Sequence, residues 1–305
     1  MQIVRPLRGI VPPLVTPLSG PDVLDIPGLE RLVDHQLEGG VSGLFLLGTT
    51  GEGPSLAYEL RRELIRRVVE RVAGRVPVLV GVTDTVYRET LRMAEFAAAH
   101  GASAIVIAPP YYFCSSQADL LRFVRQLAED SELPIFLYNM PEMTKMIFEP
   151  ETVAEAAKLD RICGLKDSSG DLEYLTRVVE IMRSRADFTI LVGPEELLRD
   201  GMRLGVHGGV HGGANILPRL YVDLYNACLE QDEARIEELH TQVLSLGSAV
   251  YDSRDKDYRY IRGIKSALSI LGICSDMTAW PYQPAGPALR ASIADYLHRH
   301  FAVQV

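Results

Sequence analysis

The sequence lacks the features that mark several broad classes of protein. Of its 305 residues, 31 are Lys or Arg and 40 are Asp or Glu, a net charge of −9 that excludes a basic nucleic-acid-binding surface. No apolar run approaches membrane-spanning length, and the first nine residues contain no apolar signal core. The four cysteines are Cys114, Cys163, Cys228 and Cys274. They form no CxxC pair and have no zinc-ligand spacing, which is typical of inert thiols in a reducing compartment. We therefore expect a soluble cytoplasmic protein without nucleic-acid or membrane partners.

Motifs that bind nucleotides or metals are also missing. No GxGxxG follows the first apolar run, and GxxxxGK[ST] and HExxH occur nowhere. His207 and His211 are four residues apart, but glycines surround them and no third ligand is evident. The glycine-rich stretch 208–213 could bind phosphate, but without a basic residue beside it we favour a close-packed turn. We expect neither a metal nor an organic cofactor.

Eight short apolar runs are present instead. They cover residues 9–11, 43–47, 78–82, 104–108, 135–138, 162–166, 189–192 and 206–210. Their apolar residues are continuous rather than alternating, which is typical of parallel strands covered on both faces. Residues with helical spacing separate them, such as Leu29, Leu32 and Val33 before the Gly39-Gly40 stop.

Eight strand–helix units in series predict a (β/α)8 TIM barrel, an α/β fold, or else a large doubly wound sheet. The missing nucleotide motifs favour the barrel. After residue 217 the strand signals cease, and 217–230, 233–250, 257–271 and 287–301 read as helices. We therefore predict a catalytic barrel over residues 1–230 and a C-terminal helical extension over 231–305.

Lysine is scarce, which draws attention to Lys166. The chain has five lysines among its 31 Lys and Arg residues, and Lys166 alone ends an apolar run. A lysine where a barrel strand ends is expected to be partly desolvated, which favours attack of its amine on a carbonyl. The alternative is a lysine whose ammonium simply reaches solvent at the barrel rim. Lys265, in the expected helix 257–271, is a competitor that we assign to packing or a salt bridge.

Other polar side chains follow neighbouring strands. Tyr138 could transfer protons, or be a barrel-top aromatic with a satisfied hydroxyl. Thr49 and Thr50 lie in a glycine-flanked turn, where hydroxyls and N–H groups could hold a carboxylate or merely cap the turn. Tyr111 and Tyr112, taken alone, are more typical of an interface or core than of catalysis.

Together, the segments 48–52, 138–141 and 164–170 resemble the dihydrodipicolinate synthase / N-acetylneuraminate lyase family in order and spacing. The resemblance covers almost the whole chain. It implies a (β/α)8 barrel with a C-terminal helical extension, and a class I aldolase or lyase that forms a Schiff base. It also implies a homotetramer built as a dimer of dimers.

The resemblance assigns roles to five residues. Lys166 matches the lysine that forms an imine with pyruvate or another 2-keto acid, and Tyr138 matches the tyrosine that moves protons. Thr49 and Thr50 match the carboxylate-binding pair, with Thr50 also among the relay hydroxyls. Tyr112 matches a tyrosine that enters the relay of a neighbouring subunit in the synthases.

The sequence also departs from the family. Dihydrodipicolinate synthases have an arginine two residues after the proline of the tyrosine motif, whereas this chain has Met143 after Glu142. A thioether cannot replace a bidentate guanidinium. Neuraminate lyases use an acid after strand 7 for sugar hydroxyls, so we place Glu195 among the substrate-binding residues, with Val210 at the end of the eighth run. Where those lyases carry a substrate-binding serine, this chain has Gly212.

These observations favour reversible cleavage of a hydroxylated 2-keto acid, of the 2-keto-3-deoxy sugar acid type, to pyruvate and an aldehyde. The first alternative is 4-hydroxy-tetrahydrodipicolinate synthase, which condenses pyruvate with aspartate semialdehyde. Arg254 or Arg259 would then replace the missing arginine. A dehydratase, a metal-dependent aldolase and a non-catalytic barrel that binds a keto acid are further alternatives.

Overall fold

The computed structural model describes residues 3–251 and 258–301, without the side chain of Arg259. Eight parallel strands form one sheet in the order β1-β10-β9-β8-β7-β6-β5-β4. They are β1 (Gly9–Ile10), β4 (Leu44–Leu46), β5 (Val78–Gly81), β6 (Ala104–Ile107), β7 (Ile135–Asn139), β8 (Ile162–Asp167), β9 (Thr189–Val192) and β10 (Gly208–Gly209). A strand is present at each of the eight predicted runs.

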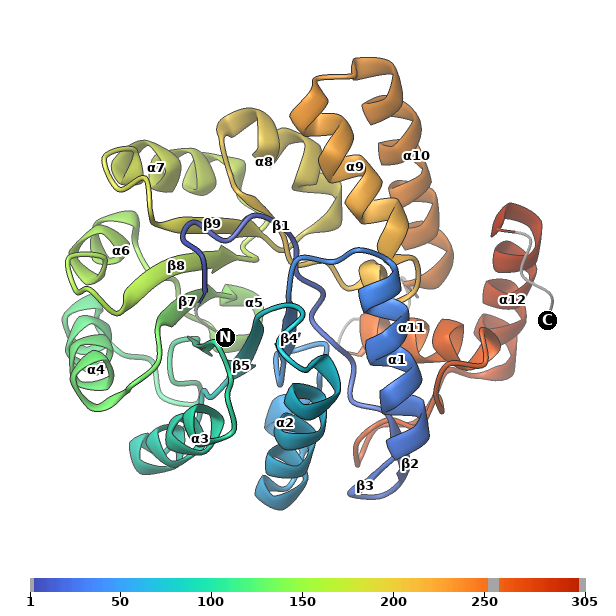
Figure 1. Cartoon of the computed structure of the whole chain (residues 1–305), viewed down its shortest axis with the longest axis horizontal. Coiled ribbons are helices and arrows are strands. Elements are labelled where there is room, and N and C mark those ends of the chain that lie inside the picture. Colours follow the sequence, from blue (N-terminus) through green and yellow to red (C-terminus); the bar gives the residue numbers. More distant parts are fainter. Residues whose placement is uncertain (1–2, 252–257, 302–305) are drawn as a thin grey trace.

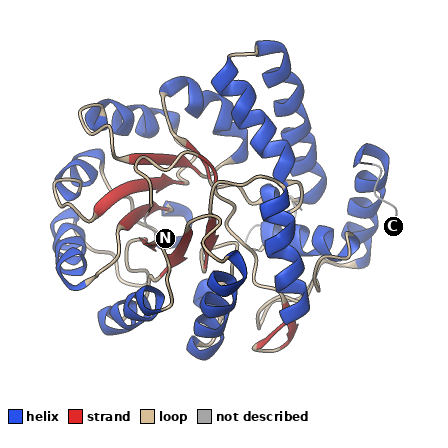
Figure 2. Cartoon of the chain, viewed as in Figure 1, coloured by secondary structure: helices blue, strands red, loops and turns tan. Residues whose placement is uncertain are grey.

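The two ends of this strand order are connected by the segment that follows β1. Pro13 pairs with Phe45 of β4, and the N–H of Leu14 donates to the carbonyl of Phe45 at 2.8 Å. The N–H of Phe45 donates to the carbonyl of Pro12 at 3.0 Å. The sheet therefore curls into a TIM-barrel-like α/β fold, with its strands in the middle of Figures 1 and 2.

Helices alternate with the strands and surround them (Figure 1). They are α1 (Ile26–Glu38), α2 (Tyr58–Val72), α3 (Tyr87–Ala99), α4 (Gln117–Asp130), α6 (Pro150–Ala156), α7 (Leu172–Met182), α8 (Leu198–Leu204) and α9 (Pro218–Glu230). Local capping explains several of their starts. Ser116 and Asp119 form a capping box at α4, and the Asp25 side chain accepts from the N–H of Gly28 at α1.

Several short elements were not predicted from the sequence. They are the hairpin of β2 (Leu18–Gly20) and β3 (Val23–Leu24), helix α5 (Pro141–Thr144), and the 3-10 turns η1 (Gly53–Ser55), η2 (Glu195–Leu197) and η3 (Gly213–Asn215). Their two to four residues are too short to show a hydrophobic period. Helix α5 and the turns η1 and η2 follow strands, so they shape the loops at the carboxyl ends of the sheet.

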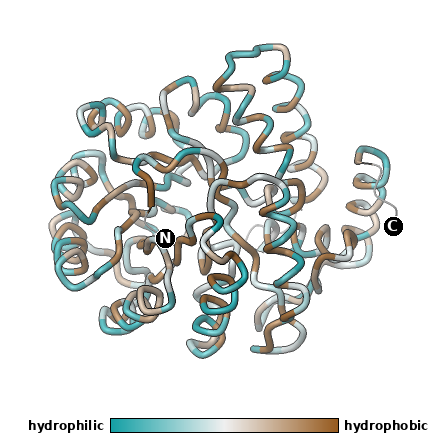
Figure 3. The backbone as a smooth tube through the Cα atoms, in the orientation of Figure 1, coloured by the Kyte–Doolittle hydropathy of each residue, from teal (hydrophilic) through white to brown (hydrophobic). Residues whose placement is uncertain are grey.

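The core has two layers because side chains alternate along each strand. Ile105 belongs to the layer between strands and helices, whereas its neighbour Val106 belongs to an inner cluster that also contains Phe45 and Phe136. Burial on both faces explains why the strand sequences are continuously apolar. Figure 3 shows hydrophobic residues along the central strands.

Three helices follow α9: α10 (Glu233–Val250), α11 (Arg259–Ile270) and α12 (Pro287–Phe301). Helix α10 packs against α9, and α12 packs against α11 and α10. Helix α9 ends at Glu230, but the predicted domain boundary between 230 and 231 stays a prediction. In the described part of the chain, no helix is both long and apolar enough to cross a membrane.

Candidate active site

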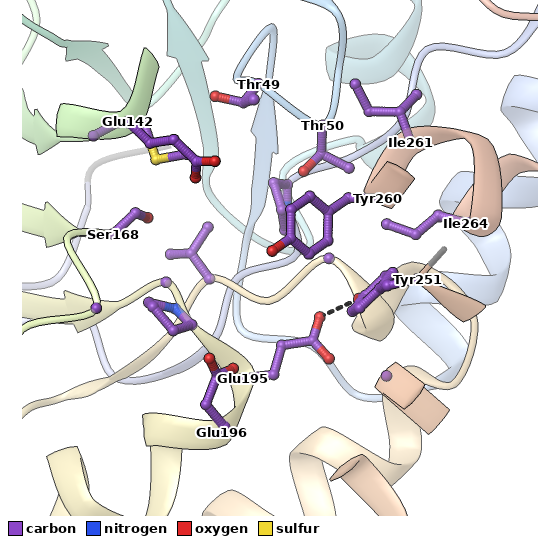
Figure 4. A pocket seen from close by; sticks show the side chains of 18 of the residues that line it. Thr49, Thr50, Glu142, Ser168, Glu195, Glu196, Tyr251, Tyr260, Ile261 and Ile264 are labelled. Carbon is purple, nitrogen blue, oxygen red and sulfur yellow. Dashed lines mark hydrogen bonds between the residues drawn. The ribbon is translucent and has the colours of Figure 1, made fainter. Parts of the chain in front are cut away.

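A pocket of about 630 Å³ opens at the carboxyl ends of the strands. Its barrel wall comes from the loops after β4, β7, β8, β9 and β10, and a second wall comes from α10, α11 and the residues beside them. The barrel wall includes Thr49, Thr50, Tyr138, Lys166, Glu195 and Val210. The carboxyl ends of the strands thus bring these predicted residues to one cavity. Figure 4 shows Thr49, Thr50 and Glu195 among them.

Lys166 lies at the base of the pocket, in an aromatic environment. It pairs in register with Tyr138 of the neighbouring strand and is only 6% exposed. Its Nζ lies 3.9 Å from the centroid of the Tyr138 ring and 5.2 Å from that of Phe45. No described carboxylate forms an ion pair with this ammonium, and the faces of the two aromatic rings lie beside it instead.

The competing lysine is engaged elsewhere. Lys265 of α11 is fully buried, forms an ion pair with Glu52 and donates to the carbonyl of Met277 at 2.7 Å. Burial lowers the pKa of Lys265, opposed by the Glu52 carboxylate. Lys265 does not line the pocket, and its ammonium is held by the Glu52 carboxylate and the carbonyl of Met277.

Tyr138 shares its hydroxyl with a threonine of the first loop. The Tyr138 Oη and the Thr49 Oγ1 are 3.1 Å apart, within hydrogen-bonding distance. The family resemblance places Thr50 among the relay hydroxyls, and that role stays a prediction. The hydroxyl that lies beside Tyr138 in the structure is that of Thr49. Thr50 lines the same pocket with its side chain. Thr49 therefore contacts the Tyr138 hydroxyl, whereas Thr50 faces the pocket.

The loop that carries these threonines is tight, which accounts for its glycines. The N–H of Gly53 donates to the carbonyl of Gly48 at 3.2 Å, and the N–H of Glu52 donates to that of Thr49 at 3.0 Å. A Cβ on Gly53 would lie 2.2 Å from the carbonyl oxygen of Leu47, so no larger residue fits there.

Tyr112 does not reach the pocket of its own chain. It lies on the loop after β6 with a positive φ of 91° and is 86% exposed. Its ring packs edge-on against that of Phe113, with centroids 5.0 Å apart. Tyr111 instead lines a smaller cavity of about 230 Å³, together with Thr49 and Tyr138. A role for Tyr112 beside Tyr138 therefore requires another subunit.

Glu195 lines the pocket, but its carboxylate is already held by three donors. Oε1 accepts from the N–H of Gly213 at 2.6 Å and from the Tyr251 hydroxyl at 2.5 Å, and Oε2 accepts from the Tyr221 hydroxyl. Burial raises the pKa of Glu195, opposed by these hydrogen bonds. One of the four lone-pair positions of a carboxylate is left for a substrate hydroxyl.

Met143, which stands where the synthases have an arginine, lines the pocket. Met143 and Glu142 lie on α5 and line the pocket, and Glu196 lines it from the loop after β9. Among the described lining residues, Lys166 is the single Lys or Arg, whereas three are glutamates. Figure 4 labels these glutamates, Glu142, Glu195 and Glu196. Arg254 and the Arg259 side chain, the suggested replacements for the missing arginine, lie outside what the structure describes.

The second wall was not foreseen from the sequence. It includes Val243, Leu244, Tyr251, Tyr258, Tyr260, Ile261 and Ile264. These residues are 77 or more positions from Lys166 in the chain. Their helices were predicted as a C-terminal extension, because a helical period does not reveal which cavity a helix faces.

The two histidines near β10 bind backbone groups of β9 and the loop after it. The Nδ1 of His207 accepts from the N–H of Ile190 at 3.0 Å, and the Nδ1–H of His211 donates to the carbonyl of Gly193 at 2.9 Å. Burial lowers the pKa of His211 to about 4. No group of three potential metal ligands occurs among the described residues. His211 therefore acts as a neutral packing residue behind the pocket.

The low pKa of His211 predicts a pH effect on stability. Between pH 6.5 and about 4 the unfolded chain binds a proton at His211 that the folded chain does not. The free energy of unfolding should therefore fall as the pH is lowered through this range, by up to about 3 kcal/mol from this group. The free energies of unfolding of the wild type and of His211→Gln, measured in urea at a series of pH values, should become more alike as the pH is lowered. A difference in unfolding free energy that does not change with pH would mean that His211 contributes only through its hydrogen bond.

Comparison with known proteins gives consistent matches over nearly the whole chain. The model of the dihydrodipicolinate synthetase family matches residues 6–299. A 4-hydroxy-tetrahydrodipicolinate synthase of Methanopyrus kandleri is 35% identical over 92% of this chain and 91% of its own. The dihydrodipicolinate synthase of Bacteroides thetaiotaomicron is 45% identical with a TM-score of 0.94, over 97% of this chain and 100% of its own. A prophage protein of the same family from E. coli K12, solved in complex with pyruvate, is 31% identical with a TM-score of 0.90, over 96% and 98%.

Proposed function

This chain belongs to the dihydrodipicolinate synthetase family, and we propose that it is a lyase that forms a Schiff base at Lys166. Its proposed reaction is the reversible cleavage of a hydroxylated 2-keto acid, of the 2-keto-3-deoxy sugar acid type, to pyruvate and an aldehyde. The fold is proposed to be a complete (β/α)8 barrel, with the C-terminal helices forming one side of the pocket.

In the proposed mechanism the Lys166 amine attacks the keto carbon, and the carbinolamine loses water to give a protonated imine. The bond between C3 and C4 then breaks, and its electron pair moves into the iminium to form an enamine. The C4 hydroxyl loses its proton as the aldehyde forms. The enamine is protonated at C3, and water releases pyruvate and regenerates the amine. The iminium itself is the electron sink, so the proposed chemistry needs no metal or organic cofactor.

The other pocket residues have proposed supporting roles. The Tyr138 hydroxyl, beside Thr49 at 3.1 Å, gives and takes the protons of imine formation and bond cleavage. Thr49, Thr50 and the N–H groups of their turn hold the keto acid carboxylate. Val210 contacts the substrate, and Glu195 or its exposed neighbour Glu196 accepts from hydroxyls of the tail.

The charge of the pocket is the observation that carries the substrate class. Three glutamates and no described Arg surround the space beyond Lys166. A second carboxylate on the substrate would be repelled there, whereas hydroxyl groups would find acceptors. Met143 provides a thioether where synthases are expected to have a guanidinium. A neutral, hydroxylated tail fits this environment better than a semialdehyde that carries a carboxylate.

The second candidate is 4-hydroxy-tetrahydrodipicolinate synthase, favoured by the names of the similar proteins. It requires a cation for the carboxylate of aspartate semialdehyde, and Arg254 or Arg259 would have to supply it. A dehydratase acting on the same class of sugar acid is a third candidate that shares the imine.

The ratio of catalytic efficiencies separates the first two candidates. We expect the wild type to cleave a 2-keto-3-deoxy sugar acid more efficiently than it condenses pyruvate with aspartate semialdehyde. Met143→Arg should raise the efficiency with the semialdehyde by about ten- to hundredfold, because a guanidinium–carboxylate contact forms. Met143→Leu is the matched control and should leave that efficiency low. Efficient condensation by the wild type, with no cleavage of any sugar acid, would establish the synthase instead.

Assembly is proposed to be a homotetramer, a dimer of dimers. The exposed aromatic pair of Tyr112 and Phe113 supports this, because such a pair is suited to an interface. In the assembled protein, Tyr112 would extend the hydroxyl relay of a neighbouring subunit.

A further inference from the structure

A buried charge cluster connects the first pocket loop to the C-terminal helices. Glu52 lies two residues after Thr50, in a left-handed conformation with φ of 57°, and is buried. Its carboxylate forms an ion pair with Lys265 and accepts at Oε2 from the Tyr258 hydroxyl at 2.8 Å. Oε2 also accepts from the N–H of Ala279 at 2.7 Å. All three partners belong to the region after α10.

Burial of both charges restricts this cluster to one geometry. The side chains of Glu52 and Lys265 have no exposed surface, so both charges are removed from water. Such a pair is tolerated only when its geometry is good and further hydrogen bonds satisfy the remaining groups. Tyr258, Ala279 and the carbonyl of Met277 supply those bonds. Moving Glu52 would leave the Lys265 ammonium buried without its counter-ion.

The backbone of Glu52 is hydrogen-bonded within the turn that carries the two threonines. The N–H of Glu52 donates to the carbonyl of Thr49 at 3.0 Å, and the Thr16 hydroxyl donates to the carbonyl of Gly51 at 2.7 Å. Thr49 and Thr50 therefore lie in a turn that is held from the barrel through Thr16 and from α11 through the carboxylate of Glu52.

Helix α11 also touches the pocket directly. Its residues Ile261 and Ile264 line the pocket, as does its N-cap Tyr258, and Figure 4 shows Ile261 and Ile264 on the same side as Thr50. Tyr258 is kept in place by its stacking on Tyr282, with centroids 3.6 Å apart. Tyr258 thus bonds Glu52 through its hydroxyl, stacks on Tyr282 and lines the pocket.

We propose that Glu52, Lys265 and Tyr258 are positioning residues that hold the 48–53 turn in the shape that binds the keto acid carboxylate. Through them the C-terminal helices set the affinity for the keto acid. The inference rests on the proposed function, because that function makes the carboxylate the ligand of this turn.

The mildest test is Tyr258→Phe, with Tyr296→Phe as its matched control. The Tyr296 hydroxyl bonds Ser245 at 2.9 Å between α12 and α10, so this control also loses one tyrosine hydroxyl bond of the C-terminal helices. Imine formation is measured as borohydride-trapped protein against pyruvate concentration. The half-saturating pyruvate concentration should rise about three- to tenfold in Tyr258→Phe, with the maximal trapped fraction kept, because the turn is displaced. It should stay unchanged in Tyr296→Phe.

A second set of variants separates positioning from stability. Glu52→Gln leaves the Lys265 ammonium unpaired, which should destabilise the fold, whereas the double variant Glu52→Gln/Lys265→Met removes both charges. The double variant should regain thermal stability relative to Glu52→Gln but keep a raised half-saturating concentration. Recovery of wild-type half-saturation together with stability would overturn the positioning role.

Amide hydrogen exchange of the peptide that spans residues 48–53 tests the turn without any substrate. Exchange should be faster in Tyr258→Phe than in Tyr296→Phe. If the wild type traps no pyruvate, the proposed function fails, and the exchange data alone decide whether this cluster holds the turn. Equal exchange in the two variants would overturn the inference.

Discussion

Replacing Lys166 by alanine is expected to reduce turnover by on the order of 10⁴–10⁶-fold, the loss typical of removing a nucleophile that acts together with its neighbours. The Nζ of Lys166 lies over the Tyr138 ring at 3.9 Å and has no described carboxylate partner, so the amine is available for covalent chemistry. Removing it removes the imine and with it the electron sink for cleavage. Steady-state rates with a 2-keto-3-deoxy sugar acid measure the loss.

Trapping identifies the nucleophile directly. Incubation of the wild type with pyruvate and borohydride should add a pyruvate-derived mass to the peptide that carries Lys166, and Lys166→Ala should not be labelled. Lys145→Ala is the control, because that exposed lysine donates to the backbone carbonyl of Glu142 rather than lining the pocket. Labelling at Lys265, or turnover without labelling, would disprove the assignment. Loss of activity on chelation, with recovery on added metal, would favour the metal-dependent aldolase.

The second large effect is expected at Tyr138. Tyr138→Phe should slow turnover by about 10²–10⁴-fold, because the phenol hydroxyl proposed to transfer protons is lost while the ring remains. The half-saturating pyruvate concentration in the trapping assay should change much less, since the proposed carboxylate contacts lie on the 48–53 turn. The measurement compares kcat with pyruvate binding for the same variant.

Tyr174→Phe provides a control for the loss of a buried hydroxyl. Tyr174 donates to the carbonyl of Phe148 at 2.7 Å and does not line the pocket, so its loss should affect stability more than turnover. Near-normal turnover of Tyr138→Phe would leave Tyr138 as a packing residue beside Lys166. An equal loss in both variants would point to a general effect on the barrel.

Much of the fold follows from local patterns. A strand lies at each of the eight apolar runs, because burial on both faces leaves a continuous apolar signature in the sequence. The helix predicted over 233–250 has these bounds in the structure, since the Asp232 side chain caps its first turn. The adjacency of Tyr138 and Lys166 also follows, because consecutive strands of such a barrel are neighbours. The order of the strands and the residues at their ends were therefore sufficient to predict that the main candidate residues lie close together.

Side-chain contacts between distant segments could not be predicted from these local patterns. The pairing of Tyr138 with Thr49 rather than Thr50 depends on how a tight glycine turn directs two adjacent hydroxyls. The occupied carboxylate of Glu195 depends on Tyr251, 56 positions later. Neither hydrophobic period nor motif carries such information, because a side chain's partner is set by packing once the whole chain has folded.

By itself, the sequence determined the alternation of strands and helices, the lysine that ends a buried strand, and the absence of an arginine after the tyrosine motif. These are properties of single segments, where burial, spacing and residue chemistry act locally. The tertiary structure alone decided that α10 and α11 form a wall of the pocket, and that Glu52 is the carboxylate that pairs with Lys265. Both outcomes bring together segments that are far apart in the chain, and their meeting is decided by the packing of the whole molecule.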